Sequence, residues 1–228
     1  MKVTFLGHSC ILIESGLGSV LIDPFLSGNP VAAITADQVA CDAIIVSHAH
    51  GDHVGDAVSI ANRLNIPVVA VYELATVLGW QGITTHAQHL GGAHEYPFGR
   101  VKFTPAAHGS SMIDEANHEL VYCGQPASIL YTAERRTVFH LGDTALIPDF
   151  ELIGRLNQVD LMIVPIGDNY TMGPEDAAEA VRMVRPKRVV PCHFDTFPLI
   201  AQDPLRFARL VGDVAEVVIL QPGSATEV

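Results

Sequence analysis

The stretch SHAHGDH, residues Ser47–His53, contains the strongest signal in this chain. It directly follows the apolar run Ala43–Val46, which predicts a buried strand. Residues two positions apart in an extended loop point the same way, so His48 and His50 can hold one metal ion together. By chance, these residue types at these spacings would occur about once in several hundred chains of this composition. The stretch therefore predicts a metal site at the end of a strand.

The second half of the stretch points to a second ion. Asp52 and His53 fall at the opening of a predicted helix, Asp52–Asn65, where their side chains turn towards another ion. Gly51 permits the tight change of backbone direction between the two pairs. One loop can therefore serve two neighbouring metal ions.

Three further ligand-type residues, His108, Asp143 and His193, each come just after a predicted strand. In α/β sheets, ligands gather beyond the carboxyl ends of strands, so these residues can converge with the SHAHGDH loop. Taken singly, each is more often a surface or capping residue, and Asp143 in Gly-Asp-Thr fits a turn or helix N-cap. Four independent placements at strand ends, one of them a specific motif, favour a common site.

The seven residues divide into two ligand sets with one bridging carboxylate. The sets are His48, His50 and His108 for the first ion, Asp52, His53 and His193 for the second, and Asp143 between them. Three imidazoles are typical of a zinc site that keeps one position open for water. Two ions about 3.5–4 Å apart can share a hydroxide, formed because bound water has its pKa lowered from about 15.7 towards 7. No serine-elbow or Cys/His nucleophile signature is present.

Periodicity predicts one α/β domain spanning residues 1–228, built as a sandwich of two mixed sheets with helices outside. No linker, low-complexity tract or repeat divides the 228 residues, of which 49% are hydrophobic. The predicted strands are Val3–Leu6, Cys10–Glu14, Ser19–Ile22, Ala43–Val46, Val68–Val71, Val101–Thr104, Ala127–Thr132, Thr137–His140, Leu161–Pro165, Arg188–Pro191 and Glu216–Leu220. The predicted helices are Asp52–Asn65, Tyr72–Leu78, Pro148–Leu156, Pro174–Val184 and Pro204–Val211.

Charge and targeting signals restrict the classes of partner. The net charge of −12 and the pI of about 5.2 argue against general nucleic-acid binding. We see no signal peptide and no apolar run of the roughly 20 residues that a membrane span needs. The four cysteines form no CxxC pair. We therefore expect a cytoplasmic protein with a small-molecule substrate and no membrane partner; a homo-oligomer is one open alternative.

SHAHGDH is similar to the HxHxDH signature of the metallo-β-lactamase superfamily. More specifically, the chain resembles small metal-dependent hydrolases close to the ascorbate-6-phosphate lactonases. The supporting stretches are VTFLGHSCILIE, IIVSHAHGDHVGD, VFHLGDT, PIGDNYTMGPEDA and VVPCHFDTFPLI. The resemblance implies a four-layer αββα sandwich, a site at one edge and the ligand sets given above. It implies two divalent ions, with zinc expected and manganese, nickel or iron as alternatives, but it implies no substrate.

Other candidates have weaker signals. His8 follows the first predicted strand and could be an extra ligand, a general acid or a substrate hydrogen bond, or equally a structural histidine. Asn169 and Thr171 could contribute neutral donors to a substrate pocket, although ordinary loop chemistry explains them slightly better. The irregular segment 108–126 could be a lid or a plain surface excursion.

These observations predict a hydrolase in which a metal-bound hydroxide attacks a small-molecule ester, lactone or amide, with Asp52 orienting the hydroxide and relaying its proton. Phosphodiester cleavage in a small phosphorylated metabolite is the nearest alternative. A di-iron redox protein is a different class, and the histidine at position 50 argues against it, because di-iron relatives generally place a carboxylate there. A non-catalytic metal-binding protein is the least favoured class.

Overall fold

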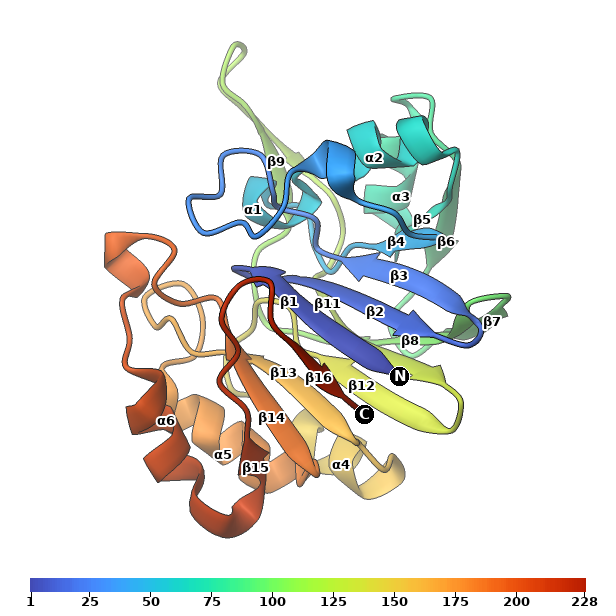
Figure 1. The fold of residues 1–228 in the computed structure, drawn as a ribbon. Coiled ribbons are helices and arrows are strands. Elements are labelled where there is room, and N and C mark those ends of the chain that lie inside the picture. The colour runs from blue at the N-terminus through green and yellow to red at the C-terminus, as the bar shows by residue number, and fades with distance from the viewer.

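The computed structural model describes residues 1–228, and two seven-stranded sheets pack face to face at its centre (Figure 1). The first sheet contains, in spatial order, β16 (Ala225–Glu227), β1 (Lys2–Gly7), β2 (Cys10–Ser15), β3 (Gly18–Ile22), β4 (Ala43–Ile45), β5 (Val68–Val71) and β6 (Thr85–Gln88). The second contains β15 (Glu216–Val217), β14 (Arg188–Cys192), β13 (Leu161–Pro165), β12 (Arg136–His140), β11 (Ala127–Ala133), β8 (Gly99–Pro105) and β7 (Ala93–Tyr96).

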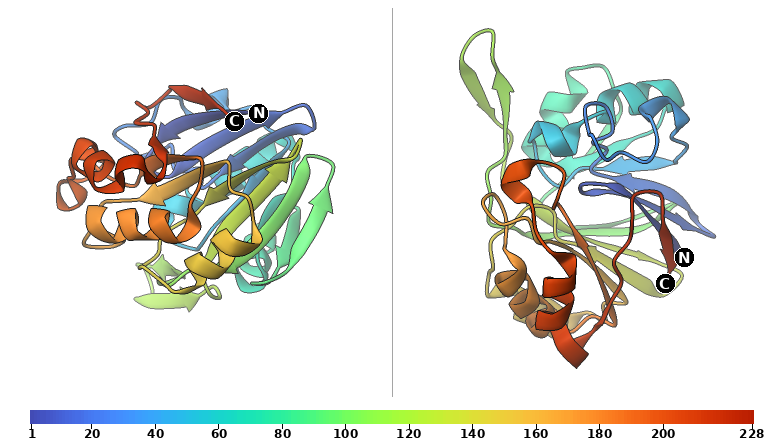
Figure 2. Two further views of the ribbon diagram at one scale, coloured as in Figure 1. Left: turned by 90° about the horizontal axis from the view of Figure 1, so that it is seen from below. Right: turned by 60° about the vertical axis from the view of Figure 1, so that its left-hand side comes forward.

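Helices cover the outer face of each sheet, which gives the expected αββα sandwich (Figures 1 and 2). The first sheet carries α1 (Gly51–Val54), α2 (Ala57–Leu64) and α3 (Tyr72–Gly79), and the second carries α4 (Asp149–Leu156), α5 (Pro174–Val184) and α6 (Pro204–Val211). Short 3-10 helices span Ala36–Gln38, Pro198–Ile200 and Gly212–Val214. Strands buried on both faces, such as β4 and β13, are continuous apolar runs, as that position requires.

Strand directions bring several carboxyl ends to one edge of the sandwich. In the first sheet β1 and β4 run the same way, because β1–β2 and β2–β3 pair antiparallel and β3–β4 pair parallel. In the second sheet β8, β12 and β14 share a direction for the same kind of reason. The loops that follow these five strands are the ones that carry the ligand candidates.

The predicted helix Asp52–Asn65 is in fact two helices. The chain breaks at Gly55, whose φ of 41° lies in the left-handed region. A Cβ at Gly55 would lie 2.4 Å from the Pro24 carbonyl oxygen, so the helix passes directly over that backbone. The Asp56 carboxylate then accepts the N–H groups of Leu26 and Ser27, at 3.1 and 2.7 Å. The break therefore ties the SHAHGDH loop to the loop after β3.

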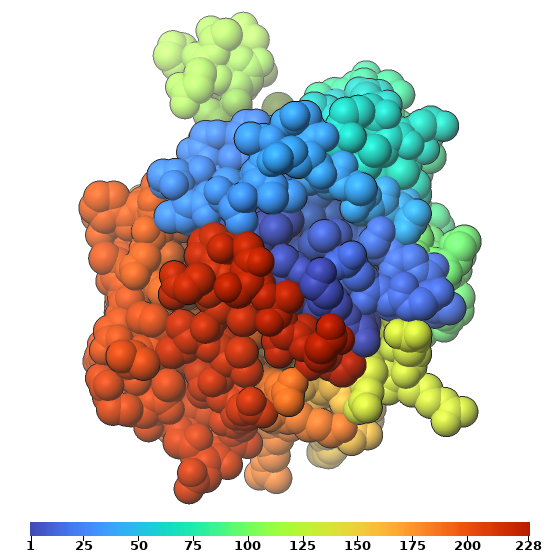
Figure 3. Space-filling model, in the orientation of Figure 1, coloured from blue at the N-terminus to red at the C-terminus, as the bar shows by residue number.

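The segment 108–126, expected to be irregular, contains a hairpin. Its strands are β9 (Ser111–Asp114) and β10 (Glu119–Tyr122), and they form a separate two-stranded sheet. Figures 1 and 3 show this hairpin standing off the body of the molecule. Strands β6, β7 and β16 were not predicted from the sequence. The predicted strand Glu216–Leu220 is too long, because β15 covers only its first part.

No helix in the structure combines the length and the hydropathy needed to cross a bilayer.

Candidate metal centre

The structure brings all seven predicted ligands together at the edge where β4, β8, β12 and β14 end. Together with His8, these residues form three overlapping clusters. Within each cluster, every potential ligand atom lies within 4.8 Å of the others. The first cluster is His48, His50 and His108, and the second is His8, Asp52, His53 and His193. A third, His48, His53 and Asp143, shares one histidine with each of these two. The first sheet supplies the SHAHGDH loop and His8, and the second supplies the remaining ligands.

Three imidazoles form the first cluster. Nδ1 of His50 lies 3.0 Å from Nε2 of His48 and 3.2 Å from Nε2 of His108. Burial lowers the pKa of His48 well below its usual value and also lowers the pKa of His50 and of His108. Neutral imidazoles that direct nitrogen atoms at one another suit a shared cation.

Asp52 gathers the second cluster. Its Oδ2 lies 3.2 Å from Nε2 of His8 and 3.7 Å from Nε2 of His193. Burial opposes the charge on Asp52, but the neighbouring imidazoles of His193 and His8 hold the pKa of this carboxyl well below its usual range. Asp52 is about one third exposed, whereas His8 and His193 are buried, so Asp52 faces the mouth of the site.

Asp143 lies between the two clusters. Its Oδ2 is 3.1 Å from Nε2 of His193 and 3.6 Å from Nε2 of His108, and its Oδ1 is 3.3 Å from Nε2 of His53. Burial opposes charge on both His53 and His193, yet the Asp143 carboxylate raises the pKa of His53 well above its usual value and the pKa of His193 to about 9. This part of the site attracts positive charge.

Buried polar atoms without partners test whether these residues fit a metal. Oδ1 of Asp143, Nε2 of His53 and both ring nitrogens of His193 are buried and make no hydrogen bond, although some lie close enough to form ion pairs. Buried polar atoms are almost always satisfied, and an orphaned one costs about 1–3 kcal/mol. Oδ1 of Asp143 and the Nε2 atoms of His53 and His193 lie close together, so these unpartnered ligand-type atoms fit a bound cation.

Asp23 supports the site and was not recognised in the sequence. Its carboxylate accepts from Nδ1 of His53 at 2.8 Å, and from the N–H and hydroxyl of Ser47 at 2.8 and 2.6 Å. Fixing Nδ1 in this way directs Nε2 of His53 towards Asp143. Asp23 directly follows the predicted strand Ser19–Ile22, a placement of the same kind as that of Asp143 after Thr137–His140.

His140 joins the two sheets behind the site. Its Nε2–H donates to the Ser9 carbonyl oxygen at 3.0 Å, and its Nδ1 accepts the Gly142 N–H at 3.0 Å. Both ring nitrogens are therefore used, and His140 is not free to bind an ion. Gly142 adopts a φ of 60°, where a Cβ would lie 2.8 Å from the Cβ of Ser47.

His8 enters the site on a left-handed backbone, with a φ of 59°. Its Nδ1 lies 2.8 Å from the Thr196 hydroxyl, while its Nε2 contacts Asp52. Because the Asp52 carboxylate can only accept, Nε2 carries the proton and the Thr196 hydroxyl donates to Nδ1. The rings of Phe25 and Phe197 lie 5.5 and 5.7 Å from the His8 ring. Burial lowers the pKa of His8 to about 4, so the imidazole is neutral near pH 7.

Asn169 and Thr171 lie on the loop after β13, without a hydrogen bond to any ligand residue. The Asn169 N–H donates to Oδ1 of Asp168, and the Thr171 hydroxyl donates to the Met172 carbonyl oxygen. The Met172 N–H donates to the Thr144 carbonyl oxygen at 3.2 Å, which fixes the loop beside the Asp143 turn. They therefore lie near the site edge, not among the metal ligands.

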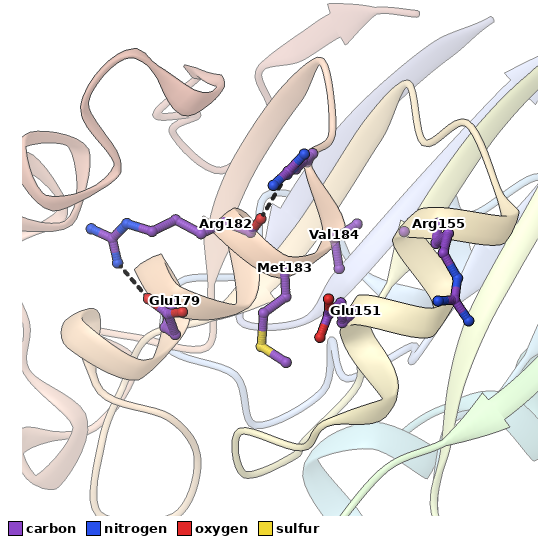
Figure 4. A pocket seen from close by; sticks show the side chains of 8 residues that line it. Glu151, Arg155, Glu179, Arg182, Met183 and Val184 are labelled. Atoms are coloured by element: carbon purple, nitrogen blue, oxygen red, sulfur yellow. Dashed lines mark hydrogen bonds and ion pairs between the residues drawn. The ribbon is translucent and has the colours of Figure 1, made fainter.

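Two surface hollows of similar size differ in what lines them. One, of about 520 Å³, opens beside the metal ligands and is lined by Ala49, His50, Gly51, Asp52, Val54, Gly55, Ser111, Met112 and Ile113. The other, also about 520 Å³, lies between α4 and α5 (Figure 4). There the Arg182 guanidinium donates hydrogen bonds to Glu179 at 2.9 Å and to the Leu210 carbonyl oxygen at 2.7 Å. Only the first hollow adjoins a chemically reactive set of side chains.

Comparison with known families agrees with this geometry. Residues 2–193 match the model of the β-lactamase superfamily domain. The chain belongs to the metallo-β-lactamase superfamily. Within it, a UPF0173 metal-dependent hydrolase of Bacillus cereus is 58% identical over 209 residues, which cover 92% of each chain. The protein is accordingly a metal-dependent hydrolase of this superfamily.

Solved structures of the superfamily share the whole architecture. Igni18, a metallo hydrolase from Ignicoccus hospitalis, aligns with a TM-score of 0.89 and 30% identity, covering 99% of this chain and 97% of its own. An isothiocyanate hydrolase from gut bacteria of Delia radicum aligns with a TM-score of 0.78 and 17% identity, covering 100% and 99%. The second likeness concerns the fold alone.

Proposed function

We propose that the protein is a dinuclear hydrolase acting on a small-molecule ester, lactone or amide. The observation that carries the proposal is the set of buried, unpartnered ligand atoms of Asp143, His53 and His193, flanked by the three imidazoles of the first cluster. His48, His50 and His108 would hold one ion, Asp52, His53 and His193 the other, and Asp143 both. Zinc suits the imidazole-rich first set, and manganese, nickel or iron are alternatives.

Divalent ions bound here would activate water as a nucleophile at neutral pH and would stabilise negative charge on the substrate oxygen. The protein itself supplies the positioning of protons. Asp52, exposed at the mouth and held by His8 and His193, is placed to accept a proton from the attacking water. His8, whose Nε2–H donates to Asp52, is placed to hold that carboxylate while Asp52 passes the proton on to the leaving group.

Asn169 and Thr171 are proposed to bind the polar part of the substrate. Their loop is fixed beside the Asp143 turn by the Met172–Thr144 backbone hydrogen bond. Neutral donors at this position suit a carbonyl substrate, because they can orient an oxygen atom without adding charge.

The test is metal content measured by mass spectrometry on protein purified without chelators, followed by hydrolysis assays on lactones, esters, amides and phosphodiesters. We expect about two transition-metal ions per chain and cleavage of at least one carbonyl substrate. His48→Ala should lose metal and activity, and the matched control His86→Ala, which changes a histidine on β6 away from the ligand clusters, should keep both. A wild-type protein that stays empty after addition of zinc, manganese, nickel or iron would contradict the proposal.

A further inference from the structure

The hairpin β9–β10 exposes an apolar face. Ile113, Leu120 and Tyr122 are 65%, 71% and 65% exposed. Ile113 pairs with Leu120, and Ser111 pairs with Tyr122. Opposed residues share one face of a hairpin, as do residues two apart, so these four side chains form a single surface, here called the hairpin face. Contiguous exposed apolar surface marks a binding site more often than chance exposure does.

The hairpin face continues into the hollow beside the metal ligands. Ser111 and Ile113 line that hollow together with His50 and Asp52. Leu120 and Tyr122 extend the same surface outward from the hollow. A molecule with its reactive group at Asp52 would therefore have its remainder lying against the hairpin.

Contacts at the hairpin base fix its position relative to the site. The Ala49 N–H donates to the Ser110 hydroxyl at 3.2 Å, and the Cys123 N–H donates to the Ser110 carbonyl oxygen at 2.9 Å. A Cβ at Gly109 would lie 3.4 Å from Nε2 of His50, so the base packs directly on a metal-ligand candidate. Met112 packs against the main hydrophobic core. The base is anchored even though the outer part stands free (Figure 3).

The acidic residues around the hairpin face, and the lack of basic ones, disfavour an anionic group there. None of the residues lining the hollow is a lysine or arginine, and the sequence contains neither from Val3 to Asn62 or from Phe103 to Glu134. The hairpin also carries Asp114, Glu115 and Glu119. Fixed negative charge repels phosphate and carboxylate groups, so an occupant of the hairpin face carries no negative charge.

We propose that the hairpin face binds an alkyl or aromatic group of the substrate, next to the bond that is cleaved. The substrate class is then an uncharged, apolar ester, lactone or amide rather than a phosphorylated metabolite. This inference rests on the proposed function, since it locates the substrate of that same site.

The test compares two hydroxamic acids that have the same metal-binding head and tails of two and eight carbons. Their dissociation constants for the metal-loaded protein are measured by calorimetry, so that no turnover is needed. We expect the eight-carbon compound to bind about tenfold to a hundredfold more tightly, because each buried methylene contributes up to about fourfold. Ile113→Ser and Leu120→Ser should each reduce this ratio severalfold. Leu17→Ser, which removes an apolar side chain of similar exposure from the β2–β3 turn, should leave it unchanged.

Equal affinities for the two tails in the wild-type protein would overturn the inference. A second result would also overturn it: Ile113→Ser leaves the ratio of the two dissociation constants unchanged but converts the protein from dimer to monomer in sedimentation. The hairpin face would then be covered by a second copy of the chain. The two hypotheses fail separately. Protein that prefers the longer tail but cleaves no ester, lactone or amide supports the binding face and contradicts the proposed reaction.

Discussion

Asp143 and Asp160 are both buried carboxylates beside the second sheet, but they differ in their hydrogen-bond partners. Asp160 accepts from Nζ of Lys187 at 2.7 Å, from Nη1 of Arg136 at 3.2 Å and from the Thr137 N–H at 2.9 Å. Asp143 has an oxygen atom with no hydrogen-bond partner and is surrounded by histidines. A saturated carboxylate holds the structure together, whereas an unsaturated one among imidazoles is organised for a cation.

Asp143→Asn should have the largest effect, and it tests the contrast between Asp143 and Asp160 most directly. The amide removes the charge and one ligand oxygen, so we expect metal content to fall and kcat/KM to fall by roughly 10³-fold. Mass spectrometry and a carbonyl-substrate assay check this. Asp160→Asn is the matched control and should retain metal and kcat/KM; a variant at position 143 that kept full metal content would show that Asp143 is not a ligand.

Removal of metal by a chelator should change the stability of the Asp143 and Asp160 variants to different extents. Removing metal present at 100 times its Kd should lower the free energy of unfolding by about 2.7 kcal/mol, since only the folded protein holds the ion. Urea unfolding with and without chelator measures this. Asp143→Asn should respond little to chelator, while Asp160→Asn should respond as the wild type does.

Asp23→Asn should weaken metal binding without removing a ligand. Because Asp23 orients Nδ1 of His53 at 2.8 Å, we expect affinity to drop by about 10- to 100-fold. A competition titration with a coloured chelator gives the value. An unchanged affinity would mean that packing alone orients His53.

Asp160→Asn should lower the free energy of unfolding by about 1–2 kcal/mol at pH 7, because the amide cannot replace the charge-assisted bonds. Half of each basic partner is exposed, so solvent screening keeps the effect small. Asp213→Asn, at an exposed aspartate, is the control. A loss above about 4 kcal/mol would indicate that the fold depends on this network far more than its exposure suggests.

The Asp160 contribution should also disappear in acid. Burial favours the neutral acid, but Lys187 and the Thr137 N–H hold the pKa of Asp160 below its usual value. A depressed folded-state pKa stabilises the protein above the unfolded value of about 3.9, and this stabilisation is lost as the pH falls through the folded-state pKa. The difference between wild type and Asp160→Asn should therefore narrow from pH 5 to pH 3 in urea unfolding of metal-free protein.

The convergence of the seven candidate ligands could be predicted because it follows from two local rules, the SHAHGDH spacing and the placement of polar residues after apolar strands. The supporting residues could not be predicted so easily. Asp23 and Thr196 act through residues far away in sequence, and nothing local distinguishes them from turn residues. His8 could be placed at the site edge, but its partners could not.

Edge strands and the hairpin were missed for a different reason. All four residues of β10 are exposed, and β7 is almost wholly exposed, so neither shows an alternation of buried and exposed side chains. Their strand character comes from pairing with a neighbour, which is a tertiary effect. The break at Gly55 was likewise invisible, because it depends on the close approach of Pro24.

The division of the ligands between the two sheets ties metal acquisition to the order of synthesis. A growing chain exposes the SHAHGDH loop early, but His193 is made near the end, and Asp143 lies on the other half of the sandwich. The proposed dinuclear site can form only after both halves have been made and have docked, because the candidate ligands converge only in the folded protein. Metal occupancy of the proposed site would thus report completed folding, and a truncated or half-folded chain would bind metal poorly.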